Sequence, residues 1–259
     1  MQTRTATRYV APLREGGSLP AIVEADDGHL YVIKFRGSGQ GPKALIAELL
    51  AGEILRALGL PVPVLALMHF DDALARAERD QEIQELLQRS VGQNIALGYL
   101  SGALPYDPLL RPLPAPELAS AIVWGDAFLT NVDRTARNPN LLLVDSQLWL
   151  IDHGAALYFH HDWDNYLERS RSRFPQVRQH ILLPAASAIA AADAALVPRL
   201  TPALFEQIVA WIPDDWLTPE ADGFASTDEQ RAAYTRYLTT RLEAPRLFAE
   251  EAIDAYRNL

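Results

Sequence analysis

The sequence predicts an α+β protein of two lobes, in which a β-rich N-terminal part precedes a mainly helical C-terminal part. Three observations predict this order. Short apolar segments separated by turn signals open the chain, and patterns of helical period dominate beyond residue 164. Between them, prolines crowd residues 105–116, which is typical of a boundary. We therefore expect one lobe over residues 1–100 and the other over residues 101–259.

The bulk composition narrows the classes of function. The chain has 259 residues, 49% of them hydrophobic and 22% charged, which suffices to bury a large core. Its net charge of -10 and the lack of a dense Lys/Arg run argue against a nucleic-acid partner. The lack of cysteines excludes disulfides and fits a reducing compartment. We find neither a signal peptide nor a bilayer-spanning stretch, so we expect a cytoplasmic protein with no membrane partner.

The N-terminal segment predicts paired strands. Residues 8–36 contain three short apolar segments, and the turn at 26–28 has the Asp-Gly signature of a tight hairpin. Alternation within the third strand, residues 30–35, places Lys34 on the face opposite Tyr31. The same alternation places Val32 beside Lys34 on that face.

The rest of the N-terminal part alternates helices and strands. A Gly-rich link leads into a helix over 42–58, with Pro42 in its first turn and Gly59 at its end. A strand begins at Pro61, a polar charged helix covers 71–90, and a strand with a connector covers 94–100.

The C-terminal part begins with a helix over 117–130 that leads into a polar loop, residues 131–140. Two apolar runs, 141–144 and 149–151, then predict the strands of a hairpin. Further helices are predicted over residues 164–180, 184–197, 202–211 and 227–256.

Polar residues lie at one end of this hairpin. Asp133 and Asn138 precede its first strand and Asp152 follows its second strand, so they meet at the same end. Hard divalent cations prefer such oxygen ligands. Asp and Asn also favour ordinary turns, but a turn does not explain an aspartate on the far side of the hairpin. Asn140 is an alternative to Asn138 as the ligand.

Upstream residues supply partners for phosphoryl transfer, which needs positioning and positive charge around phosphates. Lys34 can pair with phosphates, and Glu48 in the next helix can hold that lysine by an ion pair, with Glu53 as the competing glutamate. A Gly-rich turn in the first strands can bring backbone N–H groups close to phosphate oxygens, or can be only a hairpin turn. That turn consists of Gly16, Gly17 and Ser18.

These motifs together resemble the HipA-like kinases, a bacterial branch of the protein-kinase-like fold that is also similar to phosphoinositide kinases. The likeness covers residues 8–250 and is most specific in the polar loop and hairpin. The segments that carry it are 33–34, 47–53, 58–61, 131–140, 151–154 and 212–216. The chain is expected to differ from full-length HipA toxins in lacking their N-terminal extension. Its Gly-Gly-Ser turn is also poorer in glycine than a protein-kinase loop.

The resemblance implies a bilobal protein-kinase-like fold with ATP and Mg2+ in its cleft. Lys34 then matches the phosphate-binding lysine and Glu48 the helix glutamate that pairs with it. Asp133 matches the catalytic-loop aspartate that orients or deprotonates the acceptor hydroxyl. Asn138 and Asp152 match the metal-binding residues.

The resemblance also implies a place for the base and a reaction. Adenine is expected against the connector, with backbone hydrogen bonds at Leu97, Gly98, Tyr99 and Leu100. We expect a Ser/Thr protein kinase, with a small-molecule kinase or a catalytically silent nucleotide-binding pseudokinase as alternatives. The phosphoacceptor is thus a protein or a small molecule. By analogy with autophosphorylated loops of the family, Ser18 is a candidate acceptor.

One alternative lies outside kinase chemistry. His153, His160 and Asp162 have the composition of a metal cluster, so a metal hydrolase that acts without ATP remains open. Neighbouring histidines on a loop are more often solvated, and His153 is expected to pack beside the metal site.

Overall fold

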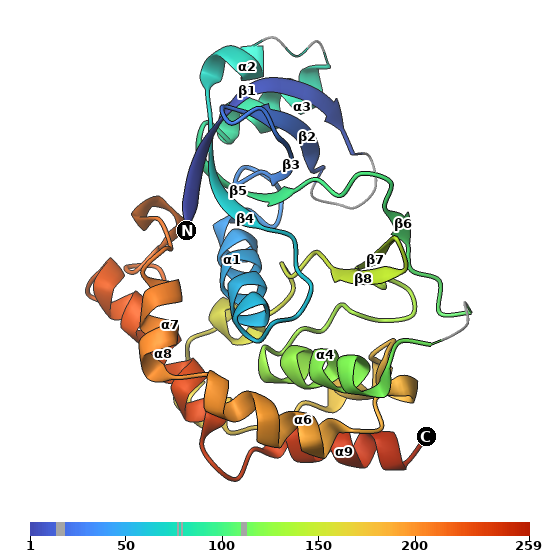
Figure 1. Cartoon of the computed structure of the whole chain (residues 1–259). Coiled ribbons are helices and arrows are strands. Elements are labelled where there is room, and N and C mark those ends of the chain that lie inside the picture. The colour runs from blue at the N-terminus through green and yellow to red at the C-terminus, as the bar shows by residue number, and fades with distance from the viewer. Residues whose placement is uncertain (14–18, 77, 79, 110–112) are drawn as a thin grey trace.

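The computed structural model describes residues 1–13, 19–76, 78, 80–109 and 113–259. A closed β-barrel lies at the top of Figure 1, the C-terminal helices lie at the bottom, and helix α1 lies between them. The predicted α+β class, with strands before helices, is confirmed. The division into lobes at residue 100 stays a prediction.

The barrel has the strand order β1-β2-β3-β5-β4 and closes because β1 pairs in parallel with β4. Its strands are β1 (Gln2–Pro12), β2 (Ala21–Ala25), β3 (Leu30–Lys34), β4 (Leu65–Phe70) and β5 (Gly92–Gly98). The remaining pairs are antiparallel. Alternate residues such as Val23, Tyr31 and Met68 fill the interior. Lys34 lies on the opposite face of β3 from Tyr31, as its position in the alternation predicts.

Helix α1 (Gly41–Ala57) is buried along most of its length and contacts both the barrel and the C-terminal part (Figure 1). Pro42 stands in its first turn, where the missing N–H costs nothing. Gly59 ends it with a φ of +79°, a conformation that glycine adopts without strain. The predicted helix over 42–58 is confirmed.

The polar segment after β4 forms two short helices, so the prediction of a single helix over 71–90 was wrong. They are α2 (Asp72–Arg76) and α3 (Gln81–Arg89). The side chain of Asp80 accepts hydrogen bonds from the backbone N–H groups of Glu82 and Ile83. This cap starts a new helix at Gln81, because it satisfies donors that a continuous helix would have paired internally.

A small antiparallel sheet opens the C-terminal part, in the order β6-β7-β8. Its strands are β6 (Leu104–Pro105), β7 (Leu141–Val144) and β8 (Gln147–Leu150). The predicted hairpin is therefore confirmed. The helices of this part are α4 (Pro116–Phe128), α5 (Tyr166–Ser170), α6 (Ile189–Leu196), α7 (Pro202–Val209), α8 (Thr227–Leu242) and α9 (Leu247–Arg257).

Three predicted helices were too long, and prolines contribute to each error. The segment 164–180 holds only α5 and a 3-10 turn that starts at Pro175. The segment 184–197 has a 3-10 turn before α6 begins. The segment 227–256 is broken between α8 and α9 around Pro245. Proline lacks the backbone N–H that continues the hydrogen bonds of a helix. Apolar residues of helical period on both sides of a proline therefore need not belong to one continuous helix.

Two apolar cores underlie this arrangement. The smaller core fills the barrel, and the larger core extends from α1 through the C-terminal helices. Trp124, Phe128 and Phe248 pack ring against ring at the centre of the larger core. Because residues of α1 belong to that core, packing helps to hold the helix between the barrel and the C-terminal helices. None of the helices in the described part of the chain is both long and apolar enough to cross a bilayer.

Candidate active site

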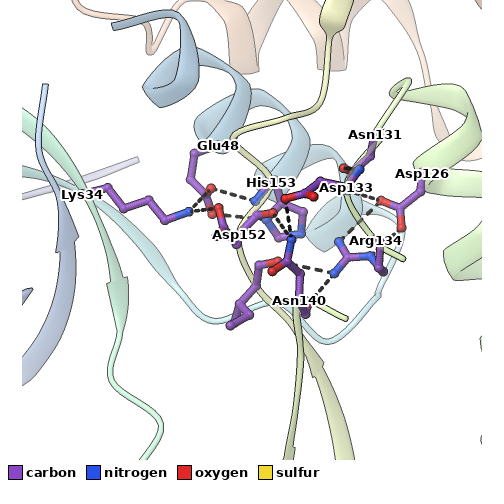
Figure 2. Close-up of polar contacts among 10 residues, drawn as sticks. Lys34, Glu48, Asp126, Asn131, Asp133, Arg134, Asn140, Asp152 and His153 are labelled. Atoms are coloured by element: carbon purple, nitrogen blue, oxygen red, sulfur yellow. Dashed lines mark hydrogen bonds and ion pairs between the residues drawn. The ribbon is translucent and has the colours of Figure 1, made fainter. Parts of the chain in front are cut away.

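Lys34 ends strand β3 and points toward α1 and the β8 end of the hairpin, as Figure 2 shows. Its Nζ lies 2.5 Å from Glu48 Oε2 and 2.6 Å from Asp152 Oδ1. Burial by itself lowers the pKa of Lys34, but the two carboxylates raise it above the usual value. The ammonium is therefore charged at neutral pH, and it joins the barrel, α1 and the segment after β8.

Glu48 lies on the buried side of α1 and is 0% exposed. Besides Lys34, it accepts a 2.7 Å hydrogen bond from the backbone N–H of His153, whose Nδ1 lies 3.2 Å from Oε1. Burial raises the pKa of Glu48, but the Lys34 charge and the His153 hydrogen bond lower it to about 2. The competing residue, Glu53, lies 3.5 Å from Arg56 instead. Of the two glutamates, the structure brings Glu48 to the lysine.

Asp152 stands directly after β8 with a φ of +56°, in the left-handed region that a non-glycine residue rarely adopts. Such strain is typical of functional sites, where the surrounding structure holds it in place. The Asp152 side chain is 49% exposed, whereas its partner Lys34 and the other carboxylate on that lysine, Glu48, are largely enclosed. Asp152 thus presents a carboxylate to solvent beside a buried ion pair.

The polar loop before β7 gathers around Asp133. Asn138 Nδ2 donates to Asp133 Oδ2 at 2.7 Å, and Asn140 Nδ2 lies 3.3 Å from the same oxygen. Asn140 Nδ2 also lies 3.4 Å from the backbone carbonyl of Asp152, so it links the two aspartates across the hairpin end. The structure thus brings both candidate asparagines to the same aspartate.

A buried network supports this loop, and sequence reasoning missed its members Asp126 and His180. Asp126, near the end of α4, accepts from Arg134 Nε at 2.6 Å and from Asn131 Nδ2 at 2.9 Å, and lies 2.9 Å from His180 Nε2. Burial raises the pKa of Asp126, but Arg134 and His180 hold it well below the usual range. Asn131 Oδ1 in turn accepts from the backbone N–H of Asp133 at 3.2 Å. The network therefore fixes the backbone that carries Asp133.

Arg134 extends the network to the other side of the hairpin (Figure 2). Its guanidinium donates to the carbonyl of Asn140 and, at 3.4 Å, to the carbonyl of Ile151. One buried side chain thus holds the loop before β7 and the segment after β8. The sequence signal was Asp126 itself, because a carboxylate inside an apolar helix needs a buried cationic partner.

In the connector, where the base was predicted to bind, some backbone groups already form hydrogen bonds within the protein. The N–H of Gly98 donates to the Val64 carbonyl at 2.9 Å, and the N–H of Tyr99 donates to the Leu30 carbonyl at 3.0 Å. A base bound there would therefore use other backbone groups among residues 97–100. The predicted phosphate turn, Gly16 to Ser18, lies outside the described residues.

Two apolar residues on the Lys34 face are further candidates for contact with a base. Val32 shares that face by strand alternation, and Ile22 is its register partner on β2. Both are half-buried, in contrast to the enclosed residues on the barrel side. Val32 could have been found by counting back two residues from Lys34, but Ile22 required the strand register.

A cavity of 620 Å³ also touches the connector. Its walls include residues 59–64, 98–100 and 147–149. None of Lys34, Asp133 or Asp152 lines it, although ligand pockets of this size are common. This cavity therefore lies apart from the polar cluster around Lys34.

The three residues of the hydrolase alternative have separate partners. His153 contacts Glu48, the buried His160 lies 3.1 Å from the Tyr234 hydroxyl, and Asp162 pairs with Arg169. Burial lowers the pKa of His160 well below its usual value. Within the described ranges of the chain, no three His, Cys, Asp or Glu side chains are grouped to hold a metal ion.

The fold and the site define a chain of the protein-kinase-like class, and comparison with known proteins gives the family. A model of HipA-like kinases matches residues 7–248. The chain therefore belongs to the HipA-like kinase family, as the motifs predicted. No curated protein matches it.

Solved structures share the fold at low sequence identity. A Helicobacter pylori proinflammatory kinase, CtkA, aligns over 99% of both chains with 14% identity and a TM-score of 0.58. A Golgi casein kinase with Mn/ADP bound has 10% identity over 96% of this chain and 76% of its own, with a TM-score of 0.49. The second likeness is too distant to support an argument, and the first shows the fold alone.

Proposed function

We propose that this chain is an ATP- and Mg2+-dependent phosphotransferase that phosphorylates Ser or Thr hydroxyls of proteins. The contact of Lys34 with both Glu48 and Asp152 is the observation that carries the proposal. Protein kinases use a lysine of the third strand, a helix glutamate and a metal-binding aspartate in this combination. Membership of a kinase family supports the same reaction.

The nucleotide lies between the barrel and the C-terminal part, which act as the two lobes. Lys34 neutralises phosphate charge, and Glu48 keeps the ammonium in place through their ion pair. Half-buried Val32 and Ile22 offer an apolar surface for the base on the same face of the barrel.

The side chains at the hairpin end fit a hard divalent cation. Asp152 supplies a half-exposed carboxylate, and Asn138 supplies an amide beside Asp133. Carboxylate and amide oxygens are the ligands that Mg2+ takes in proteins, usually with water completing the set. When bound, Mg2+ supplies positive charge beside the transferring phosphoryl group.

Asp133 aligns the acceptor hydroxyl and takes its proton. Both asparagines donate to Oδ2, so Oδ1 is the oxygen that we assign to the hydroxyl. The acceptor oxygen forms a bond to the γ-phosphorus as the bond between that phosphorus and the β,γ-bridging oxygen breaks. ADP leaves with that bridging oxygen, and the hydroxyl proton passes to Asp133.

Two substitutions test the assignment. In Asp133→Ala and Asp152→Ala, we expect turnover to fall by about 10²–10³ or more, because each removes a charged group aimed at the reaction. Asp145→Asn is a matched control, since Asp145 lies in the exposed turn at the other end of the same hairpin. Circular dichroism checks the fold. Near-normal turnover in either alanine variant would refute the assignment.

Two experiments distinguish the protein kinase from the pseudokinase and from the small-molecule kinase. Thermal-shift measurements with ATP and Mg2+, followed by transfer from γ-labelled ATP, distinguish an enzyme from a pseudokinase that binds without transfer. Supplying a cell extract as the acceptor and separating its proteins from its small molecules shows which fraction is labelled. Label found only in small molecules would replace the protein-kinase proposal with the small-molecule alternative.

A further inference from the structure

The chain contains two lysines and 21 arginines, and both lysines lie near the site. One is Lys34. The other, Lys43, stands in the first turn of α1, five residues before Glu48. A cation at a helix N-terminus opposes the helix dipole at a cost of about 0.3–1 kcal/mol. The stability of α1 itself therefore does not explain Lys43, and its tertiary contacts must.

Lys43 ties α1 to the C-terminal part. Its Nζ donates to the backbone carbonyl of His160 and to Asp222 Oδ1, each at 2.7 Å. Asp222 is held in turn, because its Oδ2 accepts from Gln230 Nε2 at 2.8 Å and from Thr218 Oγ1 at 3.0 Å. A compact ammonium reaches two acceptors in this space, whereas the planar fork of arginine suits paired oxygens.

The segment that carries Asp222 also reaches the barrel. The buried Trp216 donates from Nε1 to the Gln93 carbonyl, at the start of β5, at 3.0 Å. Asp215 forms an ion pair with Arg36, just beyond β3. Residues 215–222, which we call the strap, thus contact β5, the end of β3 and α1. The motif at residues 212–216, singled out in the sequence without a role, begins this segment.

We propose that Lys43 is a positioning residue that anchors α1 to the strap, so that Glu48 reaches Lys34. Five residues of helix separate Lys43 from Glu48, about 7.5 Å along one rigid element. A shift of the helix start therefore moves the glutamate. In protein kinases, activation-loop phosphorylation controls the position of the corresponding helix. Here an unmodified carbonyl and a carboxylate hold it.

The anchor can be tested without catalysis, because the chain has no cysteines and spin labels can be placed freely. Gln88→Cys on α3 and Ala232→Cys on α8 are exposed positions on opposite sides of the anchor. Double electron–electron resonance then gives the distance distribution between them. We expect one narrow distribution in the labelled parent and a broader or longer one after Lys43→Met.

A matched control separates anchoring from a general loss of stability. Arg246 pairs with Asp193 at 2.6 Å, and their side chains are 25% and 17% exposed, against 24% and 10% for Lys43 and Asp222. That pair joins α6 to α9 and does not involve α1. Arg246→Met should therefore leave the distance distribution narrow, even where it lowers the melting temperature as much as Lys43→Met.

The catalytic consequence rests on the proposed function and is measured separately. We expect Lys43→Met to lower kcat by about 10- to 100-fold, since displacements near 1 Å commonly cost about 10² in rate. The affinity for ATP should change by less than about threefold, because Lys43 touches the strap and not Lys34.

Two outcomes would overturn the anchor. One is an unchanged distance distribution in Lys43→Met, and the other is equal broadening in Arg246→Met. If Lys43→Met does not fold, Asp222→Asn is used in its place, because asparagine keeps an oxygen acceptor but lacks the charge. The distance distribution between the two spin labels is then compared in the same way. Absence of phosphoryl transfer in the parent would refute the proposed function and leave the distance experiment intact.

Discussion

Replacing Glu48 with glutamine removes one charge from the site and keeps its shape. Glu48 is 0% exposed and lies 2.5 Å from Lys34 Nζ. In Glu48→Gln the lysine keeps only Asp152 as a charged partner, and the N–H of His153 still finds an amide oxygen. We expect a loss of stability together with a loss of phosphoryl transfer.

The size of the stability loss follows from the pKa of Glu48, which falls from 4.5 to about 2 on folding. Each pKa unit corresponds to about 1.4 kcal/mol, so ionised Glu48 contributes about 3 kcal/mol at neutral pH. Removing one partner of a buried ion pair costs a similar amount, about 3–5 kcal/mol. The two routes agree, so we expect a decrease of about 3 kcal/mol in the free energy of unfolding.

The lowered pKa of Glu48 also predicts how its contribution to stability changes with pH. Because folding lowers this pKa, the contribution is complete above pH 4.5 and is lost as the pH falls toward 2. The difference between the wild-type chain and Glu48→Gln should therefore be about 3 kcal/mol at pH 7 and about 2 kcal/mol at pH 3.5. Urea unfolding followed by tryptophan fluorescence measures both.

Glu53→Gln is the control on the same helix. Burial raises the pKa of Glu53, and the nearby Arg56 only partly offsets that effect. Its neutral variant should lose little stability at pH 7. Equal stability of wild type and Glu48→Gln at pH 7, or a difference that stays constant down to pH 3.5, would refute the electrostatic reasoning.

Two further predictions concern the loop before β7. Asp126→Asn leaves the buried Arg134 guanidinium without its carboxylate partner. Urea unfolding should therefore show a decrease of about 3–5 kcal/mol in the free energy of unfolding. A decrease below about 1 kcal/mol would argue against the network. Asn138→Ala should raise the Mg2+ concentration for half-maximal transfer by about tenfold or more. Asn140→Ala should mainly lower stability, because Asn140 also binds the Asp152 carbonyl, and the reverse pattern would identify Asn140 as the ligand.

Local spacing along the chain determined which residues lie at the polar end of the hairpin. Two strands joined by a short turn return the chain to its starting end, so the segments before β7 and after β8 lie at the same end of the hairpin. The buried network around Asp126 then holds the loop that carries Asp133. The face of Lys34 followed from strand alternation in the same way. The roles of these residues in catalysis stay predictions.

The lengths of the C-terminal helices could not be predicted as well from the sequence. Apolar periodicity continues across 164–180 and across 227–256, but the chain breaks within each segment. Periodicity reports which side chains will be buried, and it does not report whether the backbone between them stays helical. Prolines at 175 and 245 were the available signals.

The sequence by itself determined local features of this protein: which side chains carry charge, which residues alternate along a strand and which loops lie at the same end of a hairpin. Only the tertiary structure decided the partners, because they lie far apart along the chain. Lys34 and Asp152 are 118 residues apart, and Lys43 and Asp222 are 179 apart. No local pattern encodes such pairs, since they depend on how α1 packs between the barrel and the C-terminal helices.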